Sequence, residues 1–131
     1  ALLPLPGHAR LGDAGEILAV FADADDVSGG ADSVVVDAGR LTGDVLTVDS
    51  WSEGDRLRPL GMSGTKKVSD LFVDAKVPRR ERAAVPIVRD GAHIVWVAGV
   101  RMSDEYRVTA QTTRAVRLEY RRPRAESTGS E

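Results

Sequence analysis

The sequence predicts an α+β fold, in which a β-rich body of short strands carries one helical pair inserted near its middle. Short runs of β-branched and apolar residues, separated by turns that contain glycine, occupy both ends of the chain and are typical of strands. Between them, apolar residues recur with helical spacing over a single stretch. We expect one domain over residues 1–121 and a disordered polar tail at 122–131.

The first half of the chain contains three expected strands, each a short apolar run bounded by turn residues. They are Glu16–Phe21, Ser33–Asp37 and Val45–Val48. An acidic loop, Ala22–Ala31, separates the first two, and Gly39 and Gly43 bracket the turn before the third. Cysteine is absent from the sequence, which excludes disulfides and thiolate metal ligands, and we expect no metal site.

The middle of the chain changes to a helical period. Apolar residues at i, i+3, i+4 and i+7 predict a helix, and they are Val68, Leu71, Phe72 and Ala75. A second short helix is expected over Pro78–Ala84, since proline in the first turn loses no hydrogen bond. Pro86 ends it, because the residue before a proline, Val85, is pushed out of the helical region.

Strands return after the helical pair. Pro86–Arg89 and Ala92–Val97 flank Asp90-Gly91, a dipeptide that favours a type I′ hairpin turn. Alternation along the second of these strands places Ile94 and Trp96 on one face, and we expect Trp96 in the core. Two closing strands are expected at Tyr106–Thr109 and Ala115–Tyr120.

The net charge of −2 conceals a division between the two halves of the chain. Residues 1–55 hold two basic and eleven acidic residues, whereas residues 56–124 hold sixteen basic and seven acidic ones. This distribution indicates either a surface for a polyanion such as RNA or a mixed charged surface. No apolar run approaches the ~20 residues of a membrane span, so we expect a soluble, cytoplasmic protein without a membrane partner.

Two motifs have the form of nucleotide-binding loops in an unsuitable context. Ser28–Ser33 (SGGADS) matches the signature of PP-loop enzymes, which adenylate substrates with ATP. The acidic loop before it would repel phosphate, and a strand follows where a helix is needed. Gly61–Lys67 (GMSGTKK) lacks the spacing of a Walker motif. It is either a plain turn or a loop that binds one phosphate of a nucleic-acid backbone. A nucleotide-using enzyme is therefore the weakest of our hypotheses.

Four basic residues surround the start of the second expected helix. They are Lys76, Arg79, Arg80 and Arg82. Because the guanidinium group binds phosphate with a planar fork, such a cluster is suited to clamp a nucleic-acid backbone. A solvated helix face is the alternative. Trp51, which stands between two serines, is either a core residue or a platform for base stacking.

A series of short motifs follows in fixed order along the second half. It comprises GDRLRPLGM (Gly54–Met62), GTKKVSDLF (Gly64–Phe72), DAKVPR (Asp74–Arg79), DG (Asp90-Gly91), IVWV (Ile94–Val97) and YRVT (Tyr106–Thr109). In this order and spacing the motifs closely resemble the C-terminal domain of tRNA(Ile)-lysidine synthetases, mainly between Gly54 and Tyr120. The sequence departs from that family at Asp49, where Arg is frequent, and at Ala98, where Pro is frequent.

The resemblance implies a fold similar to a β-rich domain of the phenylalanyl-tRNA synthetase β chain. It also implies a tRNA-binding accessory that contacts the acceptor stem of tRNA(Ile). The chemistry, ATP-dependent attachment of lysine to the wobble cytidine, would belong to a separate N-terminal PP-loop domain. ATP would then be a cofactor of the parent enzyme, and this chain would need none. That N-terminal domain is a second expected partner, and the resemblance also allows a homodimer.

Charge and resemblance together indicate a surface that contacts RNA phosphates. Its candidates are Arg58, Lys66, Lys67, Lys76, Arg79, Arg80 and Arg82, with Arg101 and Arg107 as second choices. Three carboxylates are expected to orient these cations: Asp55, Asp70 and Asp74. The alternative is a protein-interaction domain that docks on the catalytic domain or on a sister subunit. An exposed apolar patch around Trp51, Leu57 and Met62 would favour it.

Overall fold

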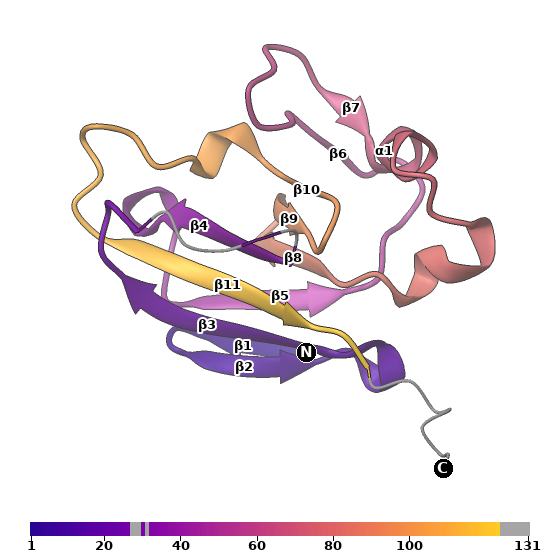
Figure 1. Cartoon of the computed structure of the whole chain (residues 1–131), viewed down its shortest axis with the longest axis horizontal. Helices are drawn as coiled ribbons and strands as arrows, with labels where there is room; N and C mark the ends of the chain where they lie inside the picture. Colours follow the sequence, from indigo (N-terminus) through magenta and orange to yellow (C-terminus); the bar gives the residue numbers. More distant parts are fainter. Residues whose placement is uncertain (27–29, 31, 124–131) are drawn as a thin grey trace.

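The computed structural model describes residues 1–26, 30 and 32–123. They form two β-sheets packed face to face, with a smaller lobe on one side (Figure 1). This body of many strands and few helical segments confirms the α+β fold that the sequence predicts. Three of the six residues of the SGGADS motif, 28, 29 and 31, and residues 124–131 of the expected tail lie outside the described residues.

The first sheet has the antiparallel strand order β2-β3-β11-β4. Its strands are β2 (Gly7–Arg10), β3 (Glu16–Ala22), β11 (Ala115–Arg121) and β4 (Ser33–Asp37). The second sheet has the order β1-β5-β8-β9-β10. Its strands are β1 (Leu2–Pro4), β5 (Val45–Asp49), β8 (Ile87–Asp90), β9 (His93–Val97) and β10 (Arg101–Met102). β11, yellow in Figure 1, lies between β3 and β4, so the last strand of the sheet in sequence pairs with two strands from the first third of the chain.

Apolar side chains from the facing surfaces of the two sheets form the main core. Its members include Leu3, Ile17, Val36, Leu46, Val48, Val88, Trp96 and Leu118, each at most 1% exposed. Trp96 is therefore a core residue, as its sequence position predicts. Burial of this kind stabilises the fold by about 25 cal/mol for each Å² of apolar surface removed from water.

Between β5 and β8 the chain leaves the second sheet and builds the lobe, residues 50–86. The lobe contains β6 (Arg56–Leu57), β7 (Lys66–Lys67), α1 (Val68–Asp74) and the 3₁₀ helix η3 (Arg79–Ala84). Its apolar side chains pack on β8 and β9 and form a second core. The buried members are Leu57, Val68, Leu71, Phe72, Ile87, Ile94 and Val97. The second sheet is thus covered on both faces.

The helical pair lies where the sequence predicts it, with two differences. α1 ends at Asp74, and Ala75 is its exposed C-cap rather than a core residue. The second helix is a 3₁₀ helix, and Pro78 is its N-cap, with ψ 146°, rather than its first residue. Val85 is extended, as the following proline requires.

The turn between β8 and β9 differs from the expected type I′ turn. Asp90 pairs with His93, so the two central residues of the turn are Gly91 and Ala92. Gly91 has a φ of 62°, but Ala92 is not among the described residues with positive φ. A type I′ turn needs positive φ at both central positions, so that expectation is wrong.

The expectation that Ile94 and Trp96 share a face is also wrong, because β9 contains a bulge. The register shifts after Val88, which pairs with Trp96, and Val95 is left as an extra residue. A bulge interrupts the alternation of side chains. Val95 and Trp96 therefore both enter the main core, whereas Ile94 and Val97 enter the second core.

Both ends of the chain hold structure that the sequence does not predict. β1 is not among the expected strands, and it is an edge strand, where Pro4 can do without an N–H. The expected strand Tyr106–Thr109 is absent from the described residues. The 3₁₀ helix η4 (Asp104–Tyr106) stands there, capped by the Ser103 side chain, which accepts from Glu105 N. Arg122, expected in the tail, instead pairs with Asp32 at 2.8 Å.

Phe72 is fully buried in the second core, where Trp51 meets its ring edge-on at a centroid distance of 5.5 Å. We expect Phe72→Ala to lower the free energy of unfolding by about 3–5 kcal/mol, because a buried ring is replaced by a cavity. Urea denaturation measures this, with Val73→Ala as the control, since Val73 lies in the same helix and is 60% exposed. Equal losses in both variants would contradict the packing described.

Candidate nucleic-acid interface

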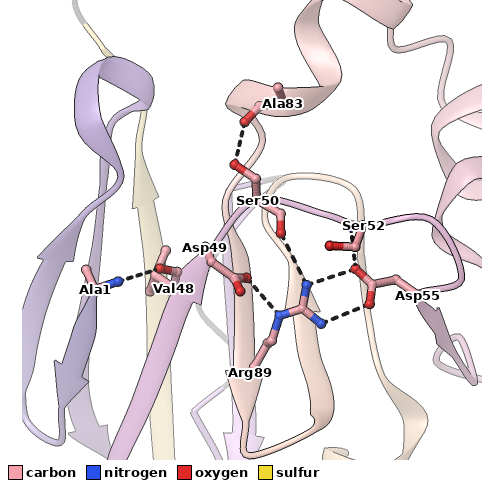
Figure 2. Close-up of polar contacts among 8 residues, drawn as sticks. All are labelled: Ala1, Val48, Asp49, Ser50, Ser52, Asp55, Ala83 and Arg89. Atoms are coloured by element: carbon pink, nitrogen blue, oxygen red, sulfur yellow. Dashed lines mark hydrogen bonds and ion pairs between the residues drawn. The ribbon is translucent and has the colours of Figure 1, made fainter.

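Arg89 binds the base of the lobe to the second sheet (Figure 2). From β8, its Nε donates to Asp49 Oδ1 at 2.7 Å, and its Nη2 donates to the Ser50 carbonyl at 3.2 Å. Its Nη1 and Nη2 donate to the two carboxylate oxygens of Asp55 at 3.1 and 2.8 Å. One guanidinium therefore joins the last residue of β5, the first residue of the lobe and the turn before β6.

Further hydrogen bonds extend this network into the lobe. The backbone N–H of Ser52 donates to the Asp55 carboxylate at 2.7 Å, and that of Val68 donates to the Asp55 carbonyl at 2.9 Å, where α1 begins. The Ser50 hydroxyl donates to the carbonyl of Ala83, near the end of η3, at 3.0 Å (Figure 2). The network thus positions both helical segments of the lobe.

The bidentate contact with Arg89 keeps Asp55 ionised. The hydrogen bonds from the guanidinium lower the pKa of the Asp55 carboxyl below its usual value of 3.8. The same contact raises the pKa of Arg89. Asp49, which departs from the family pattern, accepts a hydrogen bond from the same guanidinium.

A second carboxylate, Asp104, holds the turn after β6 to η4. It accepts from the backbone N–H of Gly61 at 3.0 Å and from Arg107 Nη1 at 2.7 Å, and it lies 3.4 Å from Arg58 Nη2. Its own backbone N–H donates to the Arg58 carbonyl at 2.7 Å. The hydrogen bond from Gly61 and the charges of the two arginines lower the pKa of Asp104.

Five of the nine candidate cations make contacts within the chain. Arg58 and Arg107 both pair with Asp104, and Lys66 pairs with Asp74. Arg82 donates to the Val77 carbonyl, and Arg101 donates to the Leu60 carbonyl. Arg82 also lies over the Phe72 ring, 5.6 Å from its centre. These five side chains support the lobe and its junction with the body.

The other four candidates are exposed, and their side chains make no hydrogen bond or ion pair within the part of the chain that the structure describes. They are Lys67, Lys76, Arg79 and Arg80. All four belong to the lobe, at the two ends of α1 and in the first turn of η3. From β6 to the end of η3 the chain has eight basic and three acidic residues, so the lobe carries a net positive charge.

Lys76 has a left-handed backbone, with a φ of 60°. Its N–H donates to the Val73 carbonyl at 3.0 Å, and the Val77 N–H donates to the Phe72 carbonyl at 2.9 Å. These two bonds form a Schellman motif, in which glycine normally occupies the left-handed position. The Cβ of lysine costs roughly 1–2 kcal/mol there. A cation therefore stands where glycine would give a more stable chain.

Sequence reasoning identifies some of the carboxylate partners and misses others. Asp74 pairs with Lys66 as expected, but the partner of Asp55 is Arg89, which is not among the candidates. An arginine inside an expected strand was the available signal for it. Asp70 forms no ion pair with the described residues, and nothing in the sequence marks Asp104 as a centre of contacts.

The apolar patch that would favour a protein-interaction domain is not formed by Trp51, Leu57 and Met62 together, because only Met62 is exposed. Leu57 is 5% exposed and belongs to the second core, and Trp51 is half-buried against Phe72. A mostly apolar cleft of about 910 Å³ lies instead between η3 and the end of β11, with Arg80 and Arg122 among its lining residues.

Neither a membrane span nor a metal site is found in the described part of the chain. No helix there has the length and apolar character needed to cross a bilayer. No group of three or more His, Cys, Asp or Glu side chains there is placed to hold a metal ion.

Comparison with known families and enzymes gives one consistent result. The family model of the TilS substrate C-terminal domain matches residues 46–120. The tRNA(Ile)-lysidine synthase of Caldanaerobacter subterraneus subsp. tengcongensis is 38% identical over 122 residues, which cover 91% of this chain and 26% of that enzyme. The synthase of Symbiobacterium thermophilum is 44% identical over 100 residues, 76% of this chain and 20% of that enzyme. The chain thus spans about a quarter or less of these relatives.

Two solved structures resemble the fold. The crystal structure of a TilS C-terminal domain matches with a TM-score of 0.80 and 32% identity, over 95% of this chain and 98% of that one. An N-terminal fragment of the phenylalanyl-tRNA synthetase β-subunit from Pyrococcus horikoshii matches with a TM-score of 0.57 over 67% of this chain and 27% of that one. At 10% identity the second likeness concerns the fold alone.

The depressed pKa of Asp55 makes a prediction about acid stability. Its ionised form contributes stability that is present above the usual value of 3.8 and is lost as the pH falls through the lower folded value. We expect Asp55→Asn to be about 1–3 kcal/mol less stable than the parent chain near neutral pH, because charge-assisted hydrogen bonds are weakened. The difference should shrink in acid, as Asp55 of the parent becomes protonated.

Urea denaturation at a series of pH values measures this difference. Asp70→Asn is the matched control, since Asp70 is exposed and forms no ion pair among the described residues. A stability difference for Asp55→Asn that stays constant from neutral to acid pH would show that the ionised carboxylate does not provide the stabilisation.

Proposed function

The chain belongs to the TilS substrate C-terminal domain family, and we propose that it is the tRNA-contacting domain of a longer tRNA(Ile)-lysidine synthase. In this proposal the lobe lies against the acceptor stem of tRNA(Ile), and its cations contact the phosphate backbone. A separate N-terminal PP-loop domain attaches lysine to the wobble cytidine with ATP. This chain supplies binding and orientation, and its partners are the tRNA and that catalytic domain.

The observation that carries the proposal is the set of four exposed cations on the lobe that lack a partner among the described residues, Lys67, Lys76, Arg79 and Arg80. Several cations of the two sheets are paired with carboxylates. Examples are Arg117 with Asp26, Arg121 with Glu119 and Arg122 with Asp32. The phosphates of RNA carry condensed counterions, and unpaired protein cations that neutralise these phosphates release the ions with a gain in entropy.

The construction of the lobe favours recognition of a backbone over recognition of bases. The groove of an A-form stem that carries the most sequence information is too deep and narrow for side chains, so stems are recognised by shape and phosphates. Of the two aromatic residues in the lobe, Phe72 is buried and Trp51 is half-buried in an edge contact with it, so the lobe presents no fully exposed ring for base stacking among the described residues. Because Arg89 and Asp104 already fix the lobe, binding needs little ordering of the chain.

We expect the chain to bind a tRNA(Ile) transcript and a minihelix of its acceptor stem with similar, salt-sensitive affinity. Lys67→Gln/Lys76→Gln/Arg79→Gln/Arg80→Gln should lower the affinity at least about tenfold. It should also reduce the slope of log K against log salt concentration by about one for each phosphate that is no longer neutralised. Fluorescence anisotropy over a range of salt concentrations measures both quantities.

A charge-matched pair of variants separates the lobe from the body. Arg79→Gln/Arg80→Gln removes two exposed charges from η3, and Arg10→Gln/Arg40→Gln removes two exposed charges from the body. Only the first is expected to weaken RNA binding. Equal effects of the two would indicate non-specific attraction, and no binding by the parent chain at low salt would contradict an RNA-contacting role.

Lys76 provides a test in which stability and binding change in opposite directions. We expect Lys76→Gly to raise the free energy of unfolding by up to about 1 kcal/mol, because glycine adopts a φ of 60° without strain. The same change should weaken RNA binding, since it removes a cation that neutralises a phosphate. Thermal denaturation and RNA titration of one preparation measure both. A variant that is more stable and binds RNA as tightly as the parent would remove Lys76 from the interface.

The second candidate function is docking on the catalytic domain or on a sister subunit. One feature favours it, the mostly apolar cleft of about 910 Å³ between η3 and the end of β11. Its lining includes Leu11, Ala83, Val85 and Val100, which offer apolar surface to a protein segment. Both functions can operate together, because the cleft and the four exposed cations share only Arg80.

A further inference from the structure

Arg56 and Lys67 face each other across the two-stranded ribbon of β6 and β7. Next to this pair along the ribbon, Asp55 precedes Arg56 and Val68 follows Lys67, and the Val68 N–H donates to the Asp55 carbonyl at 2.9 Å. In an antiparallel ladder this pattern makes Arg56 and Lys67 a non-hydrogen-bonded pair, in which the Cα atoms are about 4.5 Å apart and the side chains are closest. Both side chains are exposed and leave the ribbon on the same face.

Two like charges in directly opposite positions repel each other and destabilise the ribbon. The neighbouring pair, Leu57 and Lys66, has no such repulsion. Leu57 is buried in the second core, and Lys66 pairs with Asp74. Within the described part of the chain, the Arg56 side chain makes one hydrogen bond, to Thr65 Oγ1 at 3.5 Å, which is at the limit for such a bond. Among the described residues, no carboxylate forms an ion pair with Arg56 or Lys67.

We propose that Arg56 and Lys67 together hold one phosphate group, and that in bound RNA this group is a single phosphodiester. The guanidinium can donate two parallel hydrogen bonds to phosphate oxygens, and the lysine ammonium adds a compact charge from the opposite strand. The Thr65 hydroxyl, beside Arg56, offers a third donor. The inference rests on the proposed function, and it adds Arg56, which the sequence does not place among the candidates.

An anion between the two cations converts their repulsion into attraction to a common partner. Bound phosphate should therefore stabilise the folded chain by mass action, since the unfolded chain does not hold the two residues together. RNA is favoured over an acidic peptide as the source, because the same lobe carries the exposed Lys76, Arg79 and Arg80. A stem offers phosphates at regular spacing to all of these cations.

The first experiment uses inorganic phosphate and the 131-residue chain. In chloride buffer, Arg56→Gln and Lys67→Gln are expected to melt at or slightly above the temperature of the parent, because the repulsion is removed. At matched ionic strength, phosphate should raise the melting temperature of the parent more than that of either variant. Lower stability of both variants in chloride, or an equal phosphate effect in all three proteins, would overturn the proposal.

The second experiment titrates an acceptor-stem minihelix with the parent, both single variants and the double variant. Each single variant should weaken binding severalfold and reduce the salt slope by about one. Because both cations serve one phosphate, the double variant should lose little more than either single variant, and its slope should fall by about one rather than about two. Additive losses with a slope change of about two would overturn the shared site.

Further variants separate this inference from the proposed function. Arg40→Gln, an exposed arginine of the body, controls for loss of one charge and should leave RNA binding unchanged. If Arg79→Gln/Arg80→Gln weakens RNA binding and the Arg56 and Lys67 variants do not, the pair is not a phosphate site, while the proposed function stands. If the parent binds no RNA, the proposed function fails, and the phosphate melting experiment alone decides whether the anion site exists.

Discussion

The position of the lobe depends on the guanidinium of Arg89. Three hydrogen-bond acceptors meet at the base of the lobe: Asp49, the Ser50 carbonyl and Asp55. Without Arg89, the two carboxylates would lie close together with no cation between them. Arg89 supplies donors in a fixed plane to all three, which a lysine ammonium on a flexible stem cannot match. Since Asp55 also receives the Ser52 and Val68 N–H groups, the same contact determines where α1 begins. Because Arg89 fixes the base of the lobe, the backbone that carries the charged side chains of the lobe also has a defined position.

Three exposed cations of the lobe occupy locally unfavourable positions. Lys76 takes a left-handed backbone, and Arg56 faces Lys67 without a carboxylate among the described residues. Outside the lobe the chain pairs such groups, as it does with Arg122 and Asp32. Strain kept at a surface is commonly associated with binding, because a ligand can relieve it. The two cores and the Arg89 network provide the stability that offsets these local costs.

The sequence predicts the longer strands and the α-helix well, and the short strands and the connections poorly. Apolar periodicity is a local property, so β3, β4, β5, β11 and α1 are found within one or two residues. The bulge at Val95 lets one strand contribute side chains to both cores, and the alternation of apolar residues along that strand alone cannot show this. For the candidate site, composition identifies the lobe, but it cannot separate Lys67 and Arg79 from Arg58, which Asp104 holds. That distinction depends on residues some forty positions apart meeting in space.

The register of β5 and β8 has a consequence for the architecture. Asp49 pairs directly with Ile87, so in the topology of the sheet the entire lobe occupies the place of a hairpin loop. The entropic cost of closing a loop rises only slowly with its length, which allows a large insertion at such a point without a change of strand order. In the turn between β6 and β7, Asp104 holds Gly61, but the exposed Ser63 and Gly64 can accept an insertion. The roof over Ile87, Ile94 and Val97 cannot, because it covers the apolar face of the sheet. Growth of the domain is thereby directed outward, toward whatever the lobe binds.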